Sequence, residues 1–149
     1  MAVAGAAVVV ALAGGAPVLA SDASLRRVVA QQEKKVAVAA KNFRTESDDT
    51  VSVVGREAAS IALGKLQTAV RRQKSAVTGE KASTTRIRRA RTQYLAAVDS
   101  YATGLKTFAK GLDAYDPDSP SEAETLFKKA REQLKSATIR RLRARRVIG

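Results

Sequence analysis

The stretch YLAAVDSYATGLKTFAKGLDAY, residues 94–115, decides the fold. Its large apolar and aromatic side chains are spaced alternately four and three residues apart: Tyr94, Val98, Tyr101, Leu105, Phe108, Leu112 and Tyr115. This heptad spacing predicts a helix over about 81–115 that packs along a neighbouring helix, as in a coiled coil. Gly104 and Gly111 flank this helix-packing seam. Because glycine inside a helix costs up to about 1 kcal/mol relative to alanine, we expect a neighbouring helix to approach closely at both.

Helical spacing also predicts three further helices. The first spans about 21–43, and the second ends near Val77 with Val54 and Ile61 on its inner face. The fourth follows a predicted capping box over 119–122. Long helices joined by short loops pack as antiparallel neighbours. The expected fold is therefore all-α, an antiparallel up-down-up-down bundle of about four long helices over 21–146, with a short tail at 147–149.

Residues 1–20 form a separate apolar segment without a charged side chain. The apolar run, the Gly-Gly-Ala-Pro break and the small residues before Ser21 are typical of a signal peptide cleaved before Ser21. No basic residue precedes the run, and Arg26 and Arg27 follow it, which would suit a membrane anchor. A third alternative is a buried first helix. A cleaved signal is the preferred interpretation, which predicts an exported, extracellular or cell-envelope protein.

Composition excludes several kinds of chemistry. The 149 residues contain no cysteine and no histidine, so disulfides, thiolate sites and imidazole catalysis are absent. The acids between Asp113 and Glu124 lack the EF-hand pattern, and their place near helix ends predicts capping instead. The sequence therefore predicts no catalytic residue, no metal site and no cofactor, which favours a non-enzymatic protein.

The formal net charge of +13 is unevenly distributed along the chain. Residues 65–91 and 126–149 each carry +8, residues 92–125 carry −4, and residues 1–64 carry +1. An up-down-up-down bundle brings the second-to-third turn and the C-terminal end together. We therefore expect a strongly basic pole at that end, beside the start of the first helix.

Twelve basic residues are the predicted polyanion-binding set, because guanidinium groups bind phosphate and carboxylate in bidentate fashion. They are Arg71, Arg72, Lys74, Arg86, Arg88, Arg89, Arg91, Arg140, Arg141, Arg143, Arg145 and Arg146. The expected partner is an anionic envelope polymer or an anionic lipid surface. Nucleic acid is less favoured, because aromatic residues are only 4% of the chain and offer no stacking platform. Two alternatives are a membrane-anchored adaptor that self-associates as a homo-oligomer through the seam, and a cytoplasmic nucleic-acid-associated protein.

Overall fold

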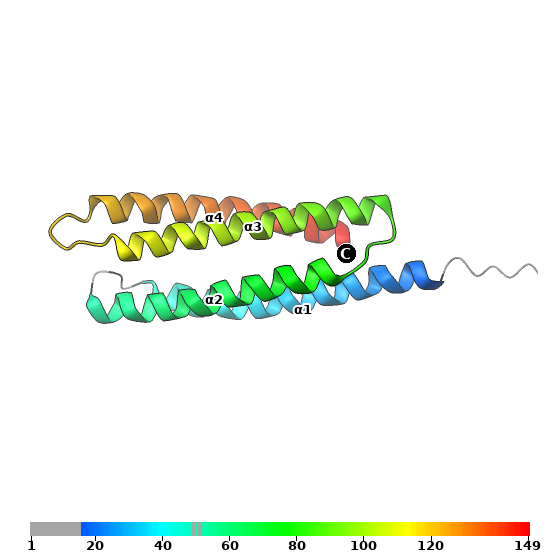
Figure 1. The fold of residues 1–149 in the computed structure, drawn as a ribbon, viewed down its shortest axis with the longest axis horizontal. Coiled ribbons are helices and arrows are strands. Elements are labelled where there is room, and N and C mark those ends of the chain that lie inside the picture. The colour runs from blue at the N-terminus through cyan, green and yellow to red at the C-terminus, as the bar shows by residue number, and fades with distance from the viewer. Residues whose placement is uncertain (1–15, 49, 51) are drawn as a thin grey trace, which may run out of the picture.

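A computed structural model describes residues 16–48, 50 and 52–149, and in these residues the chain is an all-α antiparallel bundle of four helices (Figure 1). The helices are α1 (Ala16–Glu46), α2 (Val53–Gly79), α3 (Thr85–Asp113) and α4 (Ser121–Ile148). The short turns between them place α1 beside α2 and α3 beside α4. The predicted fold class and the number of long helices are confirmed.

Side-chain caps begin two of the helices. The Ser52 hydroxyl accepts a hydrogen bond from the Gly55 amide at the start of α2, and the Thr84 hydroxyl accepts one from the Ile87 amide at the start of α3. The capping box predicted before α4 is wrong. Pro120 precedes that helix with nearly helical angles (φ −74°, ψ −8°), and no side chain caps it. Glu122 and Glu124 in the first turn interact favourably with the helix dipole instead.

The closest packing joins α3 to α4. A Cβ atom built on Gly104 would lie 2.9 Å from the Leu134 side chain, and one on Gly111 would lie 2.6 Å from the Phe127 ring. Both glycines are buried. The expected close approach of a neighbouring helix is therefore present at both positions, and α4 is the helix that makes it.

The predicted seam supplies much of the core. Its members from 94 to 108 are buried, and Leu112 packs against the core at its edge. Tyr115 lies beyond the end of α3, where the Arg56 guanidinium stands 4.4 Å from its ring centroid. On α4 the same spacing continues through Ala123, Phe127, Ala130, Leu134, Ala137, Arg141, Ala144 and Ile148, all buried except the half-buried Leu134.

The inner face of α2 differs from the prediction. Val54 and Ile61 are 77% and 55% exposed, whereas Leu63 is buried. The physical reason is that the buried stripe of α2 follows a heptad spacing through Ala59, Leu63, Leu66, Val70, Gln73 and Val77. Val54 and Ile61 lie outside that stripe.

The first helix begins earlier than predicted. α1 starts at Ala16 and continues without a break through the predicted cleavage position before Ser21. Pro17 fits in its first turn, where the missing N–H is not needed. Residues 1–15, which hold most of the predicted signal segment, lie outside the described residues. Among the helices that the structure describes, none is long and apolar enough to span a membrane.

Candidate polyanion-binding end

Three segments far apart in the sequence meet at one end of the bundle. The Asp22 carboxylate at the start of α1 accepts hydrogen bonds from the backbone amide of Ser83 at 2.9 Å and from its hydroxyl at 2.6 Å. Arg26 Nε donates to the Ile148 carbonyl at the end of α4 at 2.7 Å. The start of α1, the α2–α3 turn and the end of α4 therefore lie together (Figure 1).

Nine members of the predicted set are exposed around this end. We call them the basic end: Arg71 and Arg72 of α2, Arg86, Arg88 and Arg89 of α3, and Arg140, Arg143, Arg145 and Arg146 of α4. The predicted set lacks Arg26 and Arg27, although both are exposed on α1 near this end. The available signal was their place near the start of the predicted first helix, which an up-down-up-down fold brings to this end.

The basic side chains also line adjacent hollows between the helices. Arg86 and Arg89 share one with Val147, and Arg140 and Arg143 share the next with Ala96. Gln93 contributes to both. Guanidinium groups from α3 and α4 therefore follow one another along a single face.

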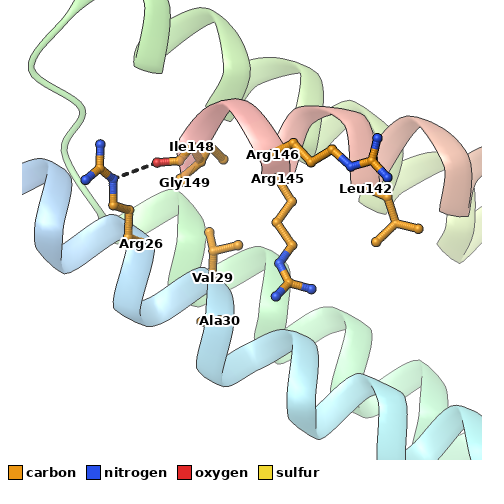
Figure 2. A pocket seen from close by; sticks show the side chains of 8 residues that line it. All are labelled: Arg26, Val29, Ala30, Leu142, Arg145, Arg146, Ile148 and Gly149. Atoms are coloured by element: carbon orange, nitrogen blue, oxygen red, sulfur yellow. Dashed lines mark hydrogen bonds between the residues drawn. The ribbon is translucent and has the colours of Figure 1, made fainter.

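A further cleft of about 450 Å³ opens between α1 and α4 (Figure 2). Its basic residues are Arg26, Arg145 and Arg146, and apolar side chains such as Val29 and Leu142 complete it. Figure 2 shows Arg145 extending from α4 into the space between the two helices. The cleft combines three cations with an apolar floor.

Three members of the predicted set, Lys74, Arg91 and Arg141, have structural roles instead. Arg91 donates to the carbonyls of Val77 and Thr78 at 3.0 and 2.5 Å, and so binds the last carbonyls of α2. Lys74 forms an exposed ion pair with Asp99 at 2.7 Å. These two side chains stabilise the bundle and contribute less to an open basic surface.

Arg141 is the clearest correction to the predicted set, because it is only 8% exposed. Its Nε lies 3.1 Å from Oε1 of Glu33, and its guanidinium stands 5.0 Å from the Tyr101 ring centroid. The physical reason is the heptad position: residue 141 continues the inner stripe of α4. A partner outside the bundle therefore cannot reach Arg141.

Arg141 belongs to a buried polar layer to which each helix contributes one side chain: Glu33, Gln73, Tyr94 and Arg141. The Tyr94 hydroxyl donates to Glu33 Oε1 at 2.5 Å, and the Gln73 amide donates to the same oxygen at 3.2 Å and to the Tyr94 hydroxyl at 2.7 Å. Burial, and then the hydrogen bond to Glu33, raise the pKa of Tyr94 well above its ordinary value. Three buried atoms in the layer, Gln73 Oε1 and Nε and Nη1 of Arg141, have no hydrogen-bond partner among the described residues, and Arg141 Nε makes only the ion-pair contact with Glu33.

The acids near the basic end are mostly engaged. Hydrogen bonds from the Ser83 hydroxyl and then from its amide lower the pKa of Asp22, so this carboxyl stays ionised. Glu33 is bound within the polar layer, and Asp99 pairs with Lys74. Local carboxylates therefore leave most of the exposed guanidinium groups uncompensated.

Neither metal-binding side chains nor comparisons with known proteins assign a function to this end of the bundle. In the part of the chain that the structure describes, no group of three or more acidic side chains is arranged to hold a metal ion. Comparisons with models of protein families, with curated proteins and with solved structures find no match. We therefore infer function from the geometry and charge of this chain.

Proposed function

We propose that this is a non-enzymatic binding protein that attaches to an anionic polymer or surface of the cell envelope through its basic end. The observation that carries the proposal is the convergence of three chain segments, which gathers nine exposed arginines around one end of the bundle. Arginine supports this proposal better than lysine would, because its planar group binds phosphate with two parallel hydrogen bonds.

The aromatic residues favour recognition of backbone charge over recognition of bases. Tyr94, Tyr101 and all three phenylalanines are buried, and Tyr115 packs under Arg56. None of them lies in the basic end, so bases would have no ring to stack on. A nucleic acid would be held through its phosphates alone.

The binding experiment uses a labelled polyphosphate chain, a DNA duplex and vesicles containing phosphatidylglycerol, each titrated at increasing NaCl concentration. The test variant is Arg86→Gln/Arg89→Gln/Arg143→Gln. The matched control, Lys106→Gln/Lys110→Gln/Lys128→Gln, removes the same charge from exposed positions toward the other end of the bundle. We expect affinity for at least one probe to fall about tenfold or more in the test variant and about twofold or less in the control.

The salt dependence of the binding constant is an independent measure of how many protein charges contact the probe. The slope of log K against log salt should decrease by about one for each contacting charge removed. Equal losses in the two triple variants would overturn the proposal, because they would show that net charge matters and its position does not. Negligible binding of the wild-type protein to all three probes would also overturn it. Which probe binds most tightly distinguishes a polymer, a nucleic acid and a lipid surface.

A further inference from the structure

A second cavity, of about 610 Å³, lies between α1 and α4 on the side of the polar layer away from the basic end. Phe43 of α1, Phe108 of α3 and Leu134 of α4 give it apolar walls. Its volume is within the range of about 300–1,000 Å³ that is usual for small-molecule sites. The cavity exists because α1 and α4 make the least extensive contact of the adjacent pairs, and because the short side chain of Ala40 leaves space between the two helices.

Part of the apolar lining is accessible, whereas Phe43 and Phe108 are only 7% and 4% exposed. Leu134 occupies an inner heptad position of α4 and is nevertheless half-buried, and Ile139 at the rim is 43% exposed. Phe43 and Phe108 meet edge to face, with ring centroids 4.9 Å apart, so this wall is firmly held. An apolar chain entering the cavity would therefore contact a preformed aromatic wall.

Cations surround the cavity. Arg44, Arg131 and Lys135 line it and are exposed, and Asp48 is the one acid among the described lining residues. None of the three cations forms an ion pair with another described residue. The rim therefore complements a negative charge.

Tyr101 offers a hydrogen-bond donor inside the cavity. Its side chain lines the cavity and is 7% exposed, and its hydroxyl makes no hydrogen bond to any described residue. Burial raises its pKa, so the hydroxyl keeps its proton at neutral pH. A donor without a protein acceptor, on a side chain that lines the cavity, is available to bind a ligand oxygen.

We propose that this cavity binds a single-chain anionic amphiphile, with its apolar chain against Phe43 and Phe108 and its acidic group among Arg44, Arg131 and Lys135. The extent of the cavity favours such a molecule over a docked helix. The Glu33–Arg141 pair bridges α1 and α4 one helical turn beyond Thr138, so this hollow does not continue as a long groove. The proposal is independent of the basic end, because none of its residues belongs to that surface.

Calorimetry with dodecanoate below its micellar concentration tests the proposal, with dodecyltrimethylammonium as a probe of equal chain length and opposite charge. The test variant is Arg131→Gln/Lys135→Gln. The matched control, Lys128→Gln/Lys129→Gln, removes two charges from the same helix at exposed positions outside the cavity. We expect dodecanoate affinity to fall about tenfold or more in the test variant and to change about twofold or less in the control.

A third variant, Ala40→Leu, fills the apolar part of the cavity and should weaken dodecanoate at least fivefold while leaving polyphosphate binding unchanged. Three outcomes would overturn the proposal. Equal loss in both charge variants would indicate attraction by net charge alone, and equal affinity for the cationic probe would indicate an apolar surface without charge selection. Concentration-dependent dimerisation that Ala40→Leu abolishes, together with no dodecanoate binding, would assign the hollow to a second copy of the chain.

Discussion

At the scale of single residues, the polar layer occupies positions that heptad spacing otherwise gives to apolar side chains. Glu33 is the centre of the layer, because its Oε1 lies within hydrogen-bonding or ion-pairing distance of Gln73, Tyr94 and Arg141. Removing one member of a buried ion pair is costly because the other charge is left uncompensated, whereas replacing both members with apolar residues is often neutral. The layer should therefore respond very differently to single and double substitutions.

We predict that Arg141→Met lowers the free energy of unfolding by about 3–5 kcal/mol. The double variant Glu33→Met/Arg141→Met should recover most of that loss, because no unpaired charge remains. Urea denaturation of the two variants measures the difference. The neighbouring exposed residue provides the control, and Arg140→Met should change stability by about 0.5 kcal/mol or less. Equal effects of Arg141→Met and Arg140→Met would contradict the buried pair.

The raised pKa of Tyr94 predicts that the folded protein loses stability in alkaline solution. The unfolded chain releases the tyrosine proton near pH 10, whereas the folded protein holds that proton to higher pH because the pKa of Tyr94 is raised. The contribution of Tyr94 is therefore fully present below about pH 10 and is lost as the pH rises further. Denaturation curves from neutral to strongly alkaline pH should show this fall.

The control for this prediction is Tyr94→Phe, which cannot titrate. It should cost about 1–2 kcal/mol at neutral pH through lost hydrogen bonds, and its stability should fall less steeply than that of the wild type in alkali. Because lysines titrate in the same range, Tyr115→Phe serves as a second reference outside the polar layer. A Tyr94→Phe profile parallel to the wild type would be inconsistent with the raised pKa.

At the scale of elements, glycine sets the distance between α3 and α4. Gly111 faces the Phe127 ring, which is itself buried in the core and cannot move aside easily. Gly64 on α2 is exposed, and a Cβ atom there would meet no atom within 4 Å. Replacing each of these two glycines with alanine should therefore change stability in opposite directions.

We predict that Gly111→Ala destabilises the protein by about 1–3 kcal/mol through overpacking. Gly64→Ala should stabilise it by up to about 1 kcal/mol, because alanine has the higher helix propensity. Thermal or urea unfolding of the two variants gives the comparison. Stabilisation by both substitutions would show that α4 does not constrain Gly111.

Element prediction succeeded where large side chains follow one period. The 94–108 part of the seam was predicted in its observed place. The prediction was wrong for Val54 and Ile61 of α2, since Val54 and Leu63 are similarly apolar and only packing against α1 and α3 decides which faces inward. Periodicity alone does not contain that information.

The candidate site was predictable in outline but not in detail. Antiparallel topology was enough to bring the basic segments together, because it depends only on helix number and loop length. The burial of Arg141 was missed because it lies within a run of arginines, although the α4 stripe continues through it to Ala144 and Ile148. The cavity around Arg44 and Arg131 was also missed, since a cavity depends on where two helices fail to touch.

At the scale of the whole molecule, repulsion among the basic side chains opposes the compact fold. The chain carries a formal net charge of +13, and the fold concentrates exposed arginines at one end. Like charges held close together repel and destabilise the compact state. Salt reduces this repulsion by shortening the distance over which exposed charges interact.

We therefore predict that the melting temperature rises when NaCl increases from about 10 mM to about 150 mM, as the Debye length falls from about 30 Å to about 8 Å. A gain of about 1 kcal/mol corresponds to a rise of about 2–4 °C for a chain of this size. Differential scanning calorimetry measures the shift. The Arg86→Gln/Arg89→Gln/Arg143→Gln variant should show a smaller rise than the wild type. A melting temperature that falls with salt would contradict repulsion at the basic end.

The pairing of helices that are neighbours in sequence also has a kinetic consequence. α1 packs mainly on α2 and α3 mainly on α4, so most native contacts close short loops. Helical proteins with such local contacts fold in microseconds to milliseconds. Contacts such as Arg26 with Ile148 join residues 122 positions apart and therefore carry a larger loop-closure entropy. During synthesis, α1 and α2 can therefore pair before α3 leaves the ribosome, and the end of α4 completes the bundle.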